Sequence, residues 1–240
     1  EKPLGIIESE AAQIEKAAAK AGVCVEAGYS FRRLPGWERA HALLRAGAIG
    51  EMVAMTGTFS FPPMSTGWAA SPDTGGGPWC FAGSHLIDQR LWYADAAPVE
   101  VYAQMRHRPD TGADEATAFQ IRFDSGVLAQ GLVTQTESAL AYRLDVRGRK
   151  GNLNLRPIGF LDFEVEVQST VAPEYAQPTK LRALITDDVR MVMHVPQLQS
   201  FAAAIRERHE PAIGVGAGRQ VLRVIDAIFA SGKAGQAVRL

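Results

Sequence analysis

The sequence predicts a mixed α/β chain: a short α/β segment, then an α+β body built around a large, mostly antiparallel sheet. Apolar residues recur with a helical period near both ends of the chain and with a period of two through its middle. Few helical stretches interrupt the alternating segments, and strands that follow one another without a crossover pair antiparallel. We therefore expect an open sheet flanked by helices.

The first segment contains a helix, a short strand and the start of a second helix. Residues 8–22 are rich in alanine, carry an apolar face and end at Gly22, a typical helix stop. Residues 23–29 are largely apolar, and we expect a short buried strand there. Pro35 opens the next helix, because its fixed φ suits a first helical turn.

The middle of the chain alternates between apolar and polar residues and predicts a run of strands. These segments cover residues 52–61, 99–105, 118–123, 127–133, 142–148 and 163–168. Residues 124–126 predict a hairpin turn, and residues 150–152 predict another turn. Phe163, Val165 and Val167 face one way and the acidic residues between them the other, so the sheet should be polar on one side.

The end of the chain is helical again. We expect one helix to start at Pro196 and a last one to run from about Ala217. The glycines of residues 214–218 resemble a dinucleotide-binding loop, but only a couple of apolar residues precede them and too little chain follows for a βαβ unit. We interpret them as the entry loop of the last helix.

Composition excludes several functional classes. The 240 residues are 47% hydrophobic and 21% charged, with a net charge of −1, as in an ordinary globular protein. No basic stripe interleaved with aromatics indicates nucleic acid, and no apolar run has membrane-spanning length. Cys24 and Cys80 form neither a metal pair nor a disulfide framework, which predicts a reducing, cytoplasmic location.

The stretch GGGPWCFAGSHLID, residues 75–88, carries the strongest chemical signal. Three glycines allow a ligand to approach the backbone, and Pro78 suits the first turn of a helix whose amides would face that ligand. His85 and Asp88 are three residues apart, so the carboxylate can reach the imidazole, fix its tautomer and raise its basicity. The pair is typical of a general base; a structural hydrogen-bonded pair is the alternative.

Lys2 is a second candidate for chemistry. It precedes Pro3, which holds it in an extended conformation from which its ammonium can point into a cleft. The remaining histidines are scattered without the spacing of metal ligands, and we expect no metal site. They are His41, which we expect to be packed on its helix, and His107, His194 and His209.

Four separated motifs share their order and spacing with one known family. They are EKPLG at residues 1–5, GYSFRRLPGWERAHALLRAGAIGE at 28–51, GGGPWCFAGSHLID at 75–88 and FAAAIRERHEPAIGVGAGRQVLRVIDAIFASGKAGQAVRL at 201–240. On these motifs the chain resembles the Gfo/Idh/MocA oxidoreductases, which include glucose–fructose oxidoreductase and inositol dehydrogenase. The resemblance implies the last α/β unit of a Rossmann domain over residues 1–33. Residues 34–240 would then be a substrate-binding and oligomerisation domain with a mostly antiparallel open sheet.

The resemblance also implies an activity, namely hydride transfer between NAD or NADP and a hydroxyl carbon of a sugar, polyol or inositol-like substrate. By position, Lys2, His85 and Asp88 would be the catalytic residues. The remaining implied contacts are with the cofactor for Glu1, Lys2, Pro3 and Arg32, and with the substrate for Trp68, Trp79 and Phe81. A homo-oligomer, either dimer or tetramer, would form through the open sheet.

The sequence departs from the family pattern in ways that keep alternatives open. Phe81 stands where the family usually has an aspartate, and Ala69 stands where an arginine often follows the tryptophan. No strand–GxGxxG–helix unit precedes the lysine motif, so we expect the chain that starts at Glu1 to be a piece of a longer protein that is inactive without the missing segment. One alternative is a non-catalytic binding or oligomerisation module. Another keeps NAD but uses it for elimination or glycoside cleavage.

Overall fold

The structure, a computed structural model, describes residues 1–63, 79–136, 141–159 and 161–240; the side chains of Cys80 and Phe81 lie outside the description. The helices are α1 (Glu8–Ala21), α2 (Pro35–Arg45), α3 (Ser84–Ala94), α4 (Val189–Glu207) and α5 (Val215–Ala234), with short turns η1 (Ser30–Arg33), η4 (Trp79–Gly83) and η5 (Pro173–Tyr175). The strands are β1 (Met52–Ser60), β2 (Pro98–His107), β3 (Asp114–Phe123), β4 (Leu128–Thr134), β5 (Ala141–Gly148), β6 (Gly151–Pro157), β7 (Phe163–Ser169), β8 (Thr179–Ala183) and β9 (Val238–Arg239).

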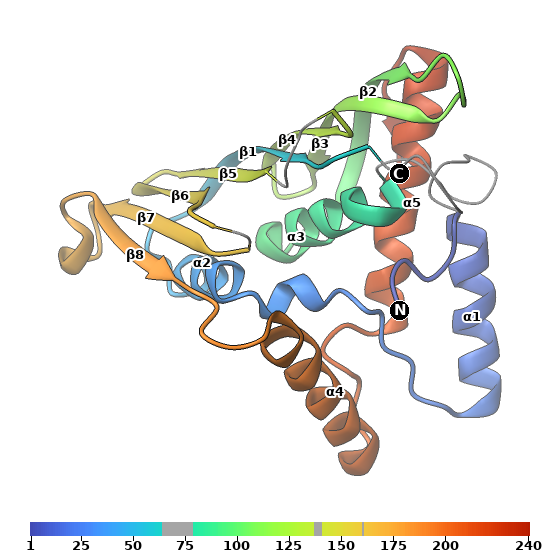
Figure 1. Cartoon of the computed structure of the whole chain (residues 1–240), viewed down its shortest axis with the longest axis horizontal. Helices are drawn as coiled ribbons and strands as arrows, with labels where there is room; N and C mark the ends of the chain where they lie inside the picture. Colours follow the sequence, from blue (N-terminus) through green and yellow to red (C-terminus); the bar gives the residue numbers. More distant parts are fainter. Residues whose placement is uncertain (64–78, 137–140, 160) are drawn as a thin grey trace.

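All of these strands belong to one sheet, in the order β8-β7-β6-β5-β1-β4-β3-β2-β9. Every neighbouring pair is antiparallel except β1 and β4, which run parallel. The predicted hairpin turn at residues 124–126 joins β3 to β4. The expectation of a large, mostly antiparallel open sheet is therefore confirmed (Figure 1).

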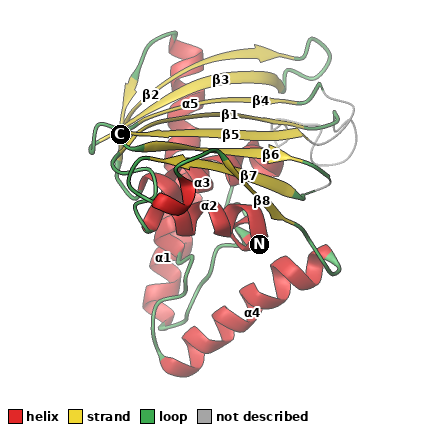
Figure 2. Cartoon of the chain, turned by 90° about the vertical axis from the view of Figure 1, so that its left-hand side faces the viewer, coloured by secondary structure: helices red, strands yellow, loops and turns green. Residues whose placement is uncertain are grey.

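Helices α2, α3 and α5 cover one face of this sheet, as Figures 1 and 2 show. The alternation in β7 follows from this cover: Phe163, Val165 and Val167 are buried, and the residues between them are not. Gly36 of α2 lies so close to Phe163 that a Cβ would come within 2.6 Å of the phenylalanine side chain. Small residues at such points let helix and sheet approach, and the core forms between them.

The opposite face carries no helix in the described part of the chain, and its charge varies from strand to strand. Toward β8 it carries ion pairs, with Arg156 2.6 Å from Asp145 and Lys180 2.9 Å from Glu164. Toward β2 it carries another, with Arg122 3.4 Å from Glu100. Between them, β1 and β4 carry neutral side chains, including the exposed Leu132. The sheet is thus polar on one side, as predicted, with a neutral strip at the centre of that side.

Three expected elements differ in the structure. Residues 23–29 do not form a strand; their one ladder contact in the described chain is the bridge from Glu26 to Gly214, and a strand needs a continuous partner. Helix α4 starts at Val189 rather than at Pro196, because the Asp188 side chain caps it by accepting a hydrogen bond from the Arg190 amide.

The third difference lies at α3, whose α-helical hydrogen bonding starts at Ser84 after a π-helical turn, η4, rather than at Pro78. Residues 75–78 lie outside the described residues. The last helix agrees better with expectation: α5 begins at Val215, and Gly214 is its N-cap. No helix in the described ranges has both the length and the apolarity to cross a membrane.

Candidate active site

A cavity of about 560 Å³ lies where the N-terminal segment, η1, the end of β1, the start of α3 and the first turns of α4 meet. Its size is typical of small-molecule sites. Most of its wall is apolar, and few polar side chains reach it. The lining residues are Glu1, Lys2, Gly28, Ser30, Phe31, Phe59, Phe61, Pro62, Pro63, Ala82, His85, Leu161, Met193 and His194.

His85 is the buried titratable side chain of this wall, with 5% of its surface exposed. The Phe31 ring stacks on the imidazole at 3.9 Å and 12°, and Tyr29 meets it edge-on at 5.8 Å. Burial, followed by the charges of Lys2 and His194, holds the pKa of His85 well below its usual 6.5. The imidazole is therefore neutral at pH 7 and can accept a proton.

The contact expected between His85 and Asp88 does not form. Both Asp88 oxygens accept from Arg32, with Nε at 2.9 Å from Oδ2 and Nη2 at 2.5 Å from Oδ1, whereas Nδ1 of His85 has no hydrogen-bond partner among the described residues. A guanidinium offers a buried carboxylate two charged donors in parallel, which a neutral imidazole cannot match. The prediction that Asp88 orients His85 is therefore wrong in this structure, and Phe31 is what packs against the imidazole.

Arg32 is an internal partner in this structure. Its side chain is 14% exposed, it binds the fully buried Asp88, and its guanidinium carbon lies 5.3 Å from the centre of the Trp92 ring. It is not among the lining residues of the cavity. The ion pair ties η1 to α3, and so it fixes Phe31 of η1 relative to His85 of α3.

Lys2 reaches the same cavity as His85, although 83 positions separate them in the sequence. Glu1 lines the cavity too, and Pro3 does not. The segment is held by the Gly28 amide, which donates to the Glu1 carbonyl at 3.1 Å. A Cβ at Gly28 would lie 2.8 Å from the Glu1 carbonyl carbon, so only glycine leaves room for this approach.

Of the three aromatic residues expected to contact substrate, the structure describes the side chain of Trp79. Trp79 is 1% exposed, donates from Nε1 to Thr117 Oγ1 at 3.3 Å and meets Phe119 edge-on at 5.6 Å. It packs in the core and does not line the cavity, so the substrate contact expected for it is not available in this structure. Trp68 and the side chain of Phe81 lie outside the described residues.

Sequence reasoning missed three side chains that meet at the cavity: Phe31, Met193 and His194. Phe31 is next to Arg32 in the second motif, so its neighbourhood could have been suspected. Met193 and His194 precede the expected start of their helix, and no local pattern sets them apart. Only the packing of the first turns of α4 near η1 brings them to His85.

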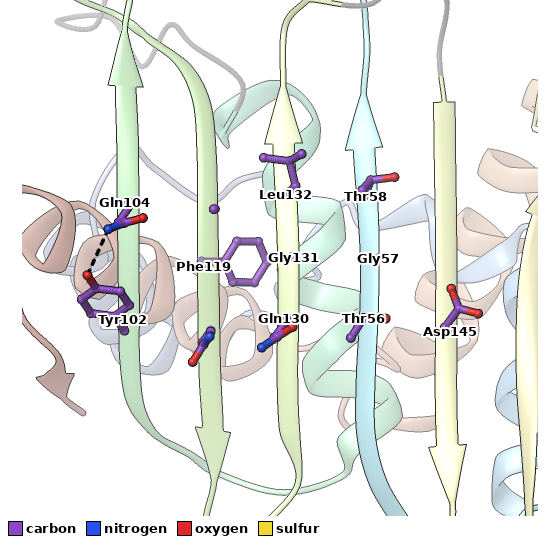
Figure 3. A pocket seen from close by; sticks show the side chains of 12 residues that line it. Thr56, Gly57, Thr58, Tyr102, Gln104, Phe119, Gln130, Gly131, Leu132 and Asp145 are labelled. Carbon is purple, nitrogen blue, oxygen red and sulfur yellow. Dashed lines mark hydrogen bonds between the residues drawn. The ribbon is translucent and has the colours of Figure 1, made fainter.

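A second hollow of about 440 Å³ lies on the open face of the sheet (Figure 3). Its lining carries hydroxyl and amide side chains such as Thr56, Thr58 and Gln130, and Gln104 donates from Nε2 to the Tyr102 hydroxyl at 3.3 Å. The carboxylate among its lining residues, Asp145, is paired with Arg147 and Arg156, so the hollow suits contact better than catalysis. We therefore place the candidate chemistry in the cavity beside His85.

The glycine-rich loop at residues 214–218 is a helix entry. A Cβ at Gly218 would lie 2.6 Å from Leu4 Cδ1 and 3.0 Å from the Cβ of Ala27. Gly218 therefore serves close packing between α5 and the N-terminal segment. In the described chain no strand directly precedes this loop, whose one ladder contact is the bridge from Glu26 to Gly214, whereas a dinucleotide-binding loop follows a strand.

The fold and cavity define an α/β protein in which an open sheet supports a small-molecule site completed by an N-terminal lysine segment. Residues 37–154 match the GFO/IDH/MocA C-terminal domain, the family that the four sequence motifs resemble. No metal-binding group of three or more His, Cys, Asp or Glu occurs among the described residues.

Two curated relatives align with almost the whole chain. D-xylose 1-dehydrogenase (NADP(+)) 2 of Haloferax volcanii is 28% identical over 248 residues, which cover 100% of this chain and 72% of the relative. The uncharacterized oxidoreductase ORF334 of Rhizobium meliloti is 25% identical, covering 98% of this chain and 70% of its own length.

Solved structures share the fold at lower identity. Aldose-aldose oxidoreductase from Caulobacter crescentus, complexed with glycerol, superposes with a TM-score of 0.86 at 24% identity, covering 100% of this chain and 70% of that one. Levoglucosan dehydrogenase, in a complex with NADH and L-sorbose, gives 0.86 at 17% identity over 99% of this chain and 71% of its own.

Proposed function

We propose that this chain is the substrate-binding part of a nicotinamide-dependent oxidoreductase that acts on a hydroxyl-bearing carbon of a sugar or polyol. The observation that carries the proposal is the meeting of Lys2 and His85 in one largely apolar cavity. The D-xylose dehydrogenase relative and the NADH-bound neighbour of the same fold support the reaction class.

In the oxidation direction His85 acts as the base. Its neutral imidazole takes the proton of the substrate hydroxyl while the carbon loses a hydride and becomes a carbonyl carbon. The Lys2 ammonium stabilises the negative charge that develops on the oxygen. The apolar wall excludes water, which strengthens both interactions. When bound, the nicotinamide supplies the hydride acceptor.

The cavity fits the reacting end of such a cofactor, because apolar walls surround the unpartnered Nδ1 of His85. Glu1 and Lys2 line the cavity and would hold that end, whereas Pro3, which does not line it, would fix the backbone next to them. We assign residues 1–33 to the Rossmann domain. We assign no phosphate cradle to residues 214–218, because no strand directly precedes them in the described chain. Arg32 would act on the cofactor indirectly, through the position of η1.

The proposal is tested by nucleotide-dependent turnover of D-xylose and related aldoses and polyols. His85→Ala should lower kcat at least about 100-fold, because general-base catalysis contributes about that much or more. His107→Ala, at an exposed position on β2, is the matched control and should keep full activity. Equal activity in the two variants would contradict the assignment of His85.

A second candidate function is a non-catalytic binding or oligomerisation module. It is favoured by the open face of the sheet, where the strip around β1 and β4 is neutral and partly apolar. In either case we propose a homo-oligomer, dimer or tetramer, that contacts through this face. Titration of the full-length gene product with NADH, followed by nucleotide fluorescence, separates the two functions. Saturable binding supports the oxidoreductase, and its absence supports the module.

A further inference from the structure

The walls of the cavity do not resemble a surface built for a fully hydroxylated sugar. Phe31, Phe59, Phe61, Pro62, Leu161 and Met193 form an apolar side of it. Side chains of this kind offer no hydrogen-bond donor or acceptor. A hydroxyl placed against them would lose its hydrogen bonds to water without replacement, which weakens binding.

The polar groups are few and do not surround the space. Lys2 and His85 supply the reacting groups, and among the described lining residues only Glu1, Ser30 and His194 add polar side chains. Polar recognition is thus sufficient for the reacting hydroxyl and a small number of neighbours.

We propose that the substrate is a sugar derivative with an apolar substituent, such as an aryl or alkyl glycoside. This inference rests on the proposed function, since the reacting hydroxyl lies between Lys2 and His85. The apolar substituent packs against Phe59, Phe61 and Met193, where aromatic rings and a thioether make favourable contacts. The cavity of about 560 Å³ has room for a sugar ring with a substituent of this kind.

The test compares phenyl β-D-xylopyranoside with D-xylose as ligands of the 240-residue chain. Saturation-transfer NMR titration gives both Kd values and shows which ligand protons touch the protein. We expect the phenyl glycoside to bind at least about tenfold more tightly, with the strongest transfer to the phenyl protons. Equal Kd values, transfer confined to the sugar protons, or no saturable binding of the glycoside would overturn the proposal.

Three variants of α4 localise the contact. Met193→Gln keeps the length of the side chain but adds an amide, and it should weaken binding of the phenyl glycoside about tenfold with little change for D-xylose. Met193→Leu stays apolar and should bind normally. Met191→Gln is the matched control, because Met191 is 52% exposed on the same helix and does not line the cavity. Equal losses in Met193→Gln and Met191→Gln would contradict the assigned wall.

The outcome also separates this inference from the proposed function, because binding requires no turnover. Tight binding of the phenyl glycoside without nucleotide reduction by any substrate would remove the oxidoreductase proposal and keep the ligand class. Turnover of free D-xylose at an equal or higher kcat/KM than the glycoside would remove the proposed ligand class and keep the oxidoreductase proposal.

Discussion

The cavity beside His85 and the depression on the open face of the sheet are similar in size. They differ in the solvent exposure of their polar side chains. In the cavity, His85 is enclosed by Phe31 and Tyr29, and burial lowers its pKa well below 6.5. On the open face, Thr56 and Gln130 stand exposed on neighbouring strands.

This difference teaches what the covering helices contribute. The same sheet contributes to both hollows, but the described side chains are removed from water on the side that α2, α3 and α5 cover. A titratable group acquires an altered pKa when it is desolvated, and such groups are the ones poised for catalysis. Substitutions should therefore have large effects in and behind the cavity and small ones on the open face.

The largest effect on stability is expected behind the cavity, at the ion pair of Arg32 with Asp88. Asp88→Asn should lower the free energy of unfolding by about 3–5 kcal/mol, because it leaves the Arg32 charge uncompensated in a buried site. The measurement is urea-induced unfolding. Asp110→Asn is the matched control, since Asp110 receives two similar bonds from Arg108 but is exposed, and it should leave the midpoint unchanged. A similar midpoint in both variants would show that the buried Asp88 pair contributes no more to the free energy of unfolding than the exposed Asp110 pair.

A loss of activity without loss of stability is expected at Lys2. Lys2→Met should reduce kcat/KM about 100-fold, because the charge that stabilises the developing alkoxide is removed while the aliphatic stem is kept. Its unfolding midpoint should match that of the unmodified chain. Lys16→Met, on the solvent-exposed side of α1, is the control and should keep full activity. If Lys2→Met retained its kcat/KM, Lys2 would have no role in the reaction.

A pH effect of intermediate size should come from His85. Its folded pKa lies below the unfolded value of about 6.5, so as the pH falls through that value the unfolded chain takes up a proton that the folded chain does not. Stability from this group is thus undiminished above pH of about 7 and is lost as the pH falls below 6.5, by at most about 1.4 kcal/mol per pH unit.

The measurement is the Tm between about pH 7 and 5 in the unmodified chain, His85→Gln and His107→Gln. His41, whose pKa is also lowered by burial, remains as a common background in all three. The decline of Tm should be shallower in His85→Gln and unchanged in His107→Gln. Parallel curves for the three proteins would show that His85 is not kept neutral by folding.

The smallest effect on the fold, with a specific effect on association, is expected on the open face. Leu132 lies on β4, in the neutral strip around β1 and β4, and is 37% exposed. Leu132→Glu should leave the unfolding free energy within about 0.5 kcal/mol and turnover unchanged, but should shift an oligomer toward monomer in light-scattering chromatography. Unaltered mass, with the unmodified chain an oligomer, would place the contact elsewhere.

Much of the fold could be predicted because its signals are local. The glycine after α1 adopts the left-handed conformation, φ +65°, that Gly22 predicts. The strand periods and the hairpin at residues 124–126 follow from alternation and turn chemistry within a few residues. The predicted start of α4 at Pro196 is wrong, because the Asp188 cap outweighs the cost of one proline within a helix of 19 residues.

The sequence by itself determined most of the helices and strands, the family resemblance and the two residues, Lys2 and His85, that meet in the cavity. Only the tertiary structure decided which partner each polar group has. Asp88 is close to His85 along the helix, but Arg32 offers it a charged bidentate contact from another element. The tertiary structure also decided that Trp79 is buried, that Met193 and His194 line the cavity and that one wall of the cavity is apolar. Contacts between distant segments leave no local pattern in a chain.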